Sequence, residues 1–212
     1  MPKFRFDKSP YSVFLGLLIS ADLAFIGVDI AYPDCGICSI GRDRGFPEVY
    51  QYIKLFWGVI LLGALALTRS SLIYASWTLV FLYLFIDDAS MLHESYGKYL
   101  ADALSFRPLF GLRAVDFGEL LITGIAGLLL LIPLTIGYFR SKEHERAFSR
   151  YLVAIVFALA FFGVFVDMLQ ITAGNTQLGE VLGMVEEGGE MIVVSVMLWF
   201  VFRHGFDRNL AQ

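Results

Sequence analysis

The sequence predicts an all-α protein, a bundle of six transmembrane helices in one domain of 212 residues. Hydrophobic residues make up 58% of the chain and charged residues 17%, whereas soluble domains have roughly 45–50% and about 25%. The mean hydropathy is correspondingly high, at +0.69. This composition excludes an ordinary soluble enzyme and a disordered chain. The net charge of −4 provides no basic surface for nucleic acid.

Six apolar runs are long enough to cross a bilayer, which takes about 20 mostly apolar residues in a helix. They are predicted at 11–31, 50–67, 72–92, 117–139, 151–172 and 187–202. The first run contains Asp22 and is longer than the apolar part of a signal peptide, so it is expected to be a true span. The last run is the least apolar at its start. The segment 95–112 is expected outside the bilayer, as a surface helix or an ordered loop.

The loop charges predict the orientation of these helices. Ten of the 16 Lys and Arg residues fall on the side that holds both termini, and six fall on the other side. The first group includes Lys3, Arg5, Lys8 and Arg208. Because cytoplasmic loops are enriched in Lys and Arg, both termini are predicted to lie in the cytoplasm and the protein in the inner (cell) membrane. Gly58, Gly63, Gly124 and Gly127 are expected to let helices approach closely.

The carboxylates have the opposite distribution. With this topology, fifteen of the 20 Asp and Glu residues lie in outer loops or at the outer ends of spans. Ionisable residues within spans are costly and usually face a bundle interior or a wet cavity. Several of these acids are three or seven residues apart, a spacing that places them on one helix face. The sequence therefore predicts a shared acidic site just beneath the outer boundary of the membrane.

Such a site needs counter-charge, since two carboxylates about 6 Å apart repel by roughly 3 kcal/mol at an effective dielectric constant near 20. A bound cation, a basic partner or protonation would relieve this repulsion, and the basic residues nearby are too few to pair with all the acids, which favours a divalent metal ion. Oxygen ligands suit a hard ion such as calcium, and a mixed carboxylate–imidazole shell suits iron, manganese or zinc, so the residue types do not select one of them. The candidate metal ligands are Asp87, Asp88, His93, Glu94, Glu119, Asp167, Glu187 and Glu190. No catalytic residue is predicted.

Di-iron carboxylate bundles are the nearest physical analogue, because they also place Glu side chains from facing helices around a metal. The analogy covers the architecture alone. His93 is the one candidate imidazole, and the acid-x-x-His spacing of those proteins is absent. His93 and Glu94 could begin an HExxH zinc motif, but its fifth position is Gly97, which excludes that motif.

Three further residue sets carry weaker predictions. Asp22 lies near the middle of the first span, either as a step in proton or cation transfer or as an acid packed against another span. Lys54 is the only lysine within a span and is expected near its outer end. Cys35 and Cys38 have the spacing of a redox-active CxxC pair, but no second pair could relay electrons, so a structural disulfide or two free thiols is favoured.

Three functions fit these features. The favoured function is an outward-facing metal site that serves catalysis or sensing. Cation or proton transport is an alternative, which is weakened because few polar groups are expected below the acids. The third is an accessory subunit whose partner would neutralise the acids. The predicted partners are the lipid bilayer and a metal ion, and an oligomer, a membrane-complex partner and enzymatic activity are left open.

Overall fold

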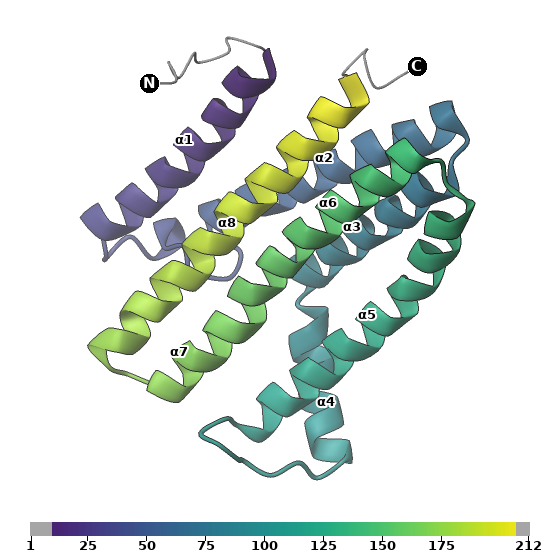
Figure 1. The fold of residues 1–212 in the computed structure, drawn as a ribbon. Coiled ribbons are helices and arrows are strands. Elements are labelled where there is room, and N and C mark those ends of the chain that lie inside the picture. The colour runs from purple at the N-terminus through teal and green to yellow at the C-terminus, as the bar shows by residue number, and fades with distance from the viewer. Residues whose placement is uncertain (1–9, 207–212) are drawn as a thin grey trace, which may run out of the picture.

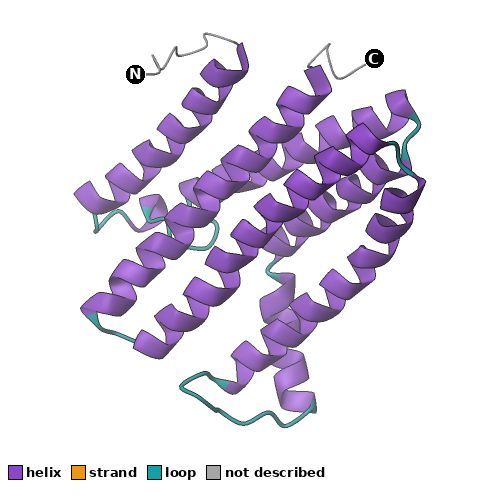
Figure 2. Cartoon of the chain, in the orientation of Figure 1, coloured by secondary structure: helices purple, strands orange, loops and turns teal. Residues whose placement is uncertain are grey.

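The computed structural model describes residues 10–206, in which the regular structure is helical apart from a single bridge between Leu109 and Leu112 (Figures 1 and 2). This confirms the all-α class. Four basic residues used to predict the orientation, Lys3, Arg5, Lys8 and Arg208, lie outside the described residues. The elements in chain order are α1 (Pro10–Ala31), η1 (Gly36–Cys38), α2 (Phe46–Arg69), α3 (Leu72–Ser90), α4 (Leu92–Ala103), α5 (Ala114–Arg140), α6 (Glu143–Ala160), the π-helical η2 (Phe161–Val166), α7 (Asp167–Ala173) and α8 (Gln177–Phe206).

Five of these helices are long and apolar enough to cross a membrane. They are α1, α2, α3, α5 and the continuous helix Glu143–Ala173 formed by α6, η2 and α7. Four of them contain the corresponding predicted span in full, and α3 covers the predicted span 72–92 except its last two residues, since the helix ends at Ser90. The sixth predicted span, 187–202, lies within α8, whose 30 residues include four Glu in the first half and make it more polar than the other five. The segment 95–112 contributes most of α4, so a short helix forms where a helix or loop was expected.

Helix α8 lies at the centre of the bundle, alongside α1, α2, α6, η2 and α7 (Figure 1). Its buried apolar residues include Met191, Val194, Leu198 and Val201, whose spacing of three or four builds one continuous helix face. At one end, the Tyr11 hydroxyl donates a hydrogen bond of 2.9 Å to the carbonyl of Phe206. The start of α1 and the end of α8 therefore lie at the same end of the bundle.

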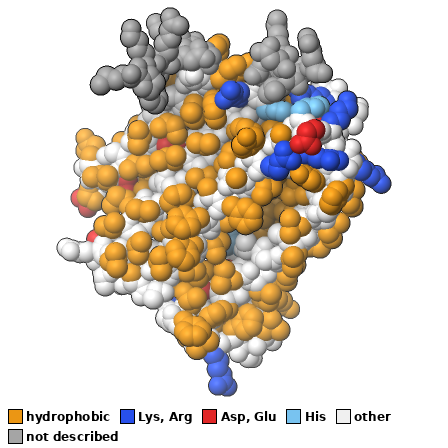
Figure 3. Space-filling model, viewed as in Figure 1, with side chains coloured by type: hydrophobic (Ala, Val, Ile, Leu, Met, Phe, Trp, Pro, Cys, Tyr) orange, Lys and Arg blue, Asp and Glu red, His pale blue; other side chains and the backbone are white. Residues whose placement is uncertain are grey.

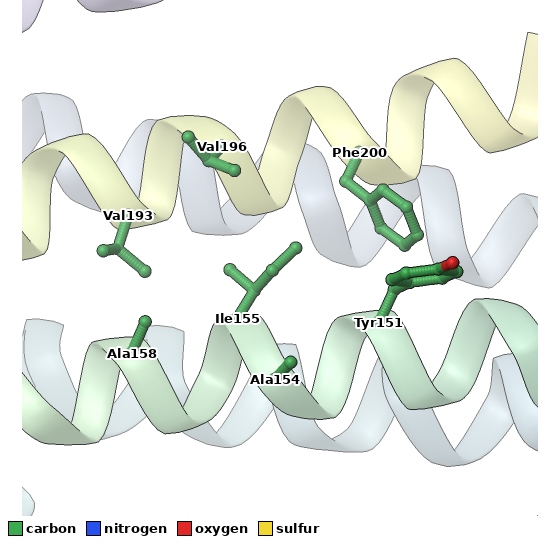
Figure 4. A pocket seen from close by; sticks show the side chains of 7 residues that line it. All are labelled: Tyr151, Ala154, Ile155, Ala158, Val193, Val196 and Phe200. Atoms are coloured by element: carbon green, nitrogen blue, oxygen red, sulfur yellow. The ribbon is translucent and has the colours of Figure 1, made fainter.

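The outside of the bundle is apolar, as contact with lipid requires. On α5, for example, Leu128 is 67% exposed and Ile132 57%. Figure 3 shows hydrophobic side chains over most of one face, with most of its Lys and Arg side chains along the upper edge. A groove of about 320 Å³ between α6 and α8 is also lined entirely by apolar side chains: Tyr151, Ala154, Ile155, Ala158, Val193, Val196 and Phe200 (Figure 4). None of the predicted site residues lines it.

Helices α4 and α5 cross closely at two glycines, Gly97 and Gly118. A Cβ atom added at Gly118 would lie 1.9 Å from the carbonyl oxygen of Gly97, so only glycine fits there. Close approach was also expected at Gly124 and Gly127, and this was wrong, because nothing lies within 4 Å of a Cβ at either position. Both occupy the outward side of α5. The spacing of small residues thus indicated packing, but could not say which glycines face a neighbouring helix.

We expect Gly118→Ala to lower the free energy of unfolding by at least 1–3 kcal/mol, because the new methyl group meets backbone that cannot move aside cheaply. Gly124→Ala is the matched control on the same helix. It should be neutral or stabilising by up to about 1 kcal/mol, since alanine favours a helix and the site is open. Denaturation of both variants in detergent measures the difference. Equal stability of the two variants would contradict the α4–α5 crossing.

Candidate functional site

A buried ion pair connects α1 to α2 in the middle of the bundle. Lys54 Nζ on α2 lies 2.8 Å from Asp22 Oδ1 on α1, and both side chains are 0% exposed. Helix α8 completes the group. Lys54 Nζ donates to the carbonyl oxygen of Met191 at 2.7 Å and to Ser195 Oγ at 3.1 Å. Ser195 Oγ in turn donates to Asp22 Oδ2 at 2.5 Å.

Every N–H group of this lysine therefore has an acceptor. An ammonium group has three donors, and Lys54 directs them to Asp22, Met191 and Ser195. The Tyr50 ring lies 4.8 Å from Lys54 Nζ and adds a cation–π contact. Removing two charges from water costs several kcal/mol each, and such complete hydrogen bonding is what makes a buried pair tolerable. The arrangement also fixes the depth of α1 against α2 and α8.

Sequence reasoning placed Lys54 near the outer end of its span, four residues after the predicted start at residue 50. Helix α2 begins at Phe46, four residues before the predicted span, so Lys54 lies about two turns inside the helix. The matching depth of the two charges becomes visible only with these observed helix bounds. Asp22 lies nine residues before the end of α1 at Ala31, and Lys54 eight residues after the start of α2. Opposite charges at matching depths in two consecutive spans predict an ion pair.

Above this pair, toward the end of the bundle where α3 ends and α8 begins, lies a group of three carboxylates that we call the outer acidic site: Asp88, Glu187 and Glu190. Gln51, one turn before Lys54, donates from Nε2 to Glu190 Oε2 at 3.5 Å and also lies beside Asp88. Glu187 is one turn before Glu190 and close to both other carboxylates. Asp88 Oδ2 is buried with no hydrogen-bond partner.

A π-helix shapes the wall of the outer acidic site. Helices α6 and α7 are joined by η2, whose Gly163 faces Glu190. A Cβ atom at Gly163 would lie 1.9 Å from Glu190 Oε1, so the carboxylate occupies the space that a side chain would fill. Single π-helical turns within α-helices occur frequently at functional sites. Neither Gly163 nor Gln51 was predicted, because a π-turn and a cross-helix amide contact have no signal in residue spacing.

A second acidic group lies where α3, α4 and α5 meet. The Asp87 carboxylate accepts hydrogen bonds of 3.0 Å from the backbone N–H and from Nδ1 of His93. This carboxylate raises the pKa of His93 to about 9, although partial burial opposes the shift. Burial also raises the pKa of nearby Glu94, helped by the negative charge of Asp43. His93 is therefore an imidazolium paired with Asp87 at neutral pH.

The remaining predicted ligands surround this pair. Glu119 on α5 packs against Gly97 of α4 and lies near His93. Asp167 on α7 lies between the two groups, within electrostatic range of His93 and of Glu190. Asp116, which was not predicted as a ligand, is fully buried and bonded to Arg113 at 2.6 Å, an ion pair that begins α5.

The eight predicted ligands thus fall into two neighbouring groups. Asp88, Glu187 and Glu190 form one, and Asp87, His93, Glu94 and Glu119 form the other, with Asp167 between them. Within residues 10–206, no three His, Cys, Asp or Glu side chains are already arranged around one metal position. The loop between α1 and α2 contains a disulfide between Cys35 and Cys38.

A family model described as "Domain of unknown function (DUF8692)" matches residues 46–204. The chain belongs to this family. The matched residues begin with α2 and end in the last turns of α8, so they include Lys54 and both acidic groups, while Asp22 on α1 lies before them. Comparison with curated proteins and with solved structures gave no match.

Breaking the ion pair should be strongly destabilising. Asp22→Asn and Lys54→Met each leave one buried charge without its partner, which costs about 3–5 kcal/mol. The double variant Asp22→Asn/Lys54→Met buries no charge and should recover most of that loss. Asp29→Asn, the same substitution seven residues along α1, is the control and should change little. Unfolding in detergent measures all four, and additive losses in the double variant would rule out the pair.

Asp87→Asn should return the pKa of His93 from about 9 toward its ordinary value of 6.5, because the neutral amide no longer stabilises the imidazolium. NMR of the ring resonances measures this pKa, with His144 as an internal control. The pair's stabilisation should be complete below about pH 6.5 and be lost as the pH rises through about 9. A His93 pKa that is unchanged by the substitution would refute the pairing.

Proposed function

We propose that the protein crosses the inner membrane six times, with both ends in the cytoplasm. Helix α8 supports the sixth crossing, because its 30 residues extend about 45 Å and the hydrocarbon core is about 30 Å thick. The start of α1 lies beside the end of α8, as an even number of crossings requires. The excess of Lys and Arg on this side assigns it to the cytoplasm.

The function that the geometry supports best is cation binding at the outer acidic site, which faces outward in this topology. One observation carries the proposal: Asp88 Oδ2 is buried without a donor, beside the carboxylates of Glu187 and Glu190. In the part of the chain that the structure describes, no Lys or Arg forms an ion pair with Asp88, Glu187 or Glu190. Three clustered acids that lack a basic partner require a proton or a cation.

The available ligands favour a hard divalent ion. The outer acidic site offers only oxygen ligands, namely its carboxylates and the amide oxygen of Gln51, and these suit calcium or manganese. His93 belongs to the other group and is held by Asp87, which disfavours a zinc shell rich in imidazole. Because no three such side chains of the described residues already surround one position, binding would require the carboxylates of this site to move closer together.

The apolar core below the ion pair favours binding at one face over passage through the bundle. Leu62, Met197 and Val201 are 0% exposed and Val194 is 1% exposed, and they belong to one continuous apolar cluster. We therefore propose sensing or catalysis at the outer face. Cation or proton transport is the second candidate. It is supported by the Lys54–Asp22 pair, which would be a charged step within the membrane, but it needs this core to open.

Metal binding to the purified, metal-stripped protein tests the proposal. We expect Mn²⁺ or Ca²⁺ to bind at one site per chain, and Asp88→Asn or Glu190→Gln to weaken that binding at least tenfold, a loss of about 1.4 kcal/mol or more. Glu180→Gln is the control, since it is the same substitution on an exposed residue of α8. Gly163→Ala should also weaken binding, because its methyl group displaces only the Glu190 carboxylate.

Calorimetry and elemental analysis provide the two readouts. A wild-type protein that binds neither ion, or variants that bind as well as Glu180→Gln, would defeat the proposal. Uptake of the same ion into proteoliposomes, lost in Asp22→Asn, would instead establish the transport alternative.

A further inference from the structure

The Cys35–Cys38 disulfide connects no two helices. It closes a turn of four residues within the loop between α1 and α2, and the same turn is held by a backbone hydrogen bond of 2.8 Å from the Cys38 N–H to the Cys35 carbonyl. A disulfide constrains the unfolded chain less as the closed loop becomes shorter. The disulfide therefore contributes little to the stability of the fold, which favours a chemical role for it.

A positive charge lies against the turn. Arg42 Nη1 would be only 2.6 Å from a Cβ atom at Gly36, so the guanidinium packs onto the backbone between the two cysteines. Among residues 10–206, Arg42 forms no ion pair with a carboxylate. A nearby cation stabilises a thiolate, which is both the attacking and the leaving form in disulfide exchange. Ile37, between the cysteines, is 46% exposed, so the turn is open to solution.

We propose that Cys35–Cys38 is a redox-active pair that exchanges with low-molecular-weight thiols such as glutathione. A glutathione thiolate attacks one cysteine sulfur, forming a mixed disulfide, and the Cys35–Cys38 bond breaks. The released cysteine thiolate is stabilised by Arg42 or takes a proton from water. A second glutathione thiolate attacks the mixed disulfide and expels the other cysteine. The protein gains two electrons, and two glutathione molecules become one glutathione disulfide.

The partner must come from solution on the same side as the loop, because the chain has only two cysteines and no internal pair to pass electrons to. The loop also touches the outer acidic site. Gly41 lies next to Glu187, with a Cβ at Gly41 placed 3.9 Å from Glu187 Oε1. Reduction would therefore loosen a turn beside this site. The redox proposal itself does not depend on cation binding.

Equilibration of the detergent-purified full chain with buffers of reduced and oxidised glutathione tests the proposal. Acid quenching, alkylation and mass spectrometry then count the free thiols. In oxidising buffers we expect the disulfide form, in which no cysteine is alkylated. In reducing buffers we expect the dithiol form, in which both are alkylated, and the conversion should be reversible. Arg42→Gln removes the charge that stabilises the thiolate, so its disulfide should be harder to reduce. Half-conversion should need a ratio of reduced to oxidised glutathione that is at least roughly three-fold higher than for wild type. Arg44→Gln, in the same loop, should match wild type.

Two results would overturn the proposal. One is a disulfide that reacts with glutathione only after the protein is unfolded, which would make it structural. The other is an equal shift in Arg42→Gln and Arg44→Gln. The variant Cys35→Ser/Cys38→Ser supplies an independent check, because it should fold with nearly the thermal stability of wild type. A large loss of stability would show that the bond serves the fold.

Discussion

A lysine inside an apolar helix bundle can keep its charge only if each N–H group finds an acceptor, and this requirement organises the centre of the protein. Lys54 satisfies it with a carboxylate from α1 and with a hydroxyl and a carbonyl from α8. Three helices are thus fixed at one depth. The same arrangement brings Gln51, one turn along α2, to Glu190, the residue before Met191 on α8. The geometry of the outer acidic site follows from this buried pair.

The distribution of polarity follows the same physical logic. The outside of the bundle is apolar, so the desolvation free energy of each buried polar group must be offset by partners inside the bundle. In the Asp22–Lys54 and Asp116–Arg113 pairs an opposite charge offsets this free energy, and His93 does the same for Asp87. The outer acidic site lacks such a solution among the described residues. It is therefore the site at which we propose that a cation supplies the missing counter-charge.

Local departures from regular helices occur beside this site. The π-helix η2 positions Gly163 so that the Glu190 carboxylate lies against its backbone. On the opposite side, the loop with the Cys35–Cys38 disulfide brings Gly41 to Glu187. Both elements thus lie directly against a carboxylate of the site.

The sequence by itself determined the all-α class and the positions of the apolar helices, because length, hydropathy and local periodicity are properties of one segment at a time. For 95–112 it left a helix and a loop open, and the structure decided for the helix α4. Residue spacing also identified acids that share a helix face, such as Glu187 and Glu190. Only the tertiary structure decided which faces meet. It paired Asp22 with Lys54, divided the predicted ligands into two groups and placed Gly163 against Glu190. Periodicity defines the face of a helix, whereas the neighbour of that face depends on packing between segments distant in sequence.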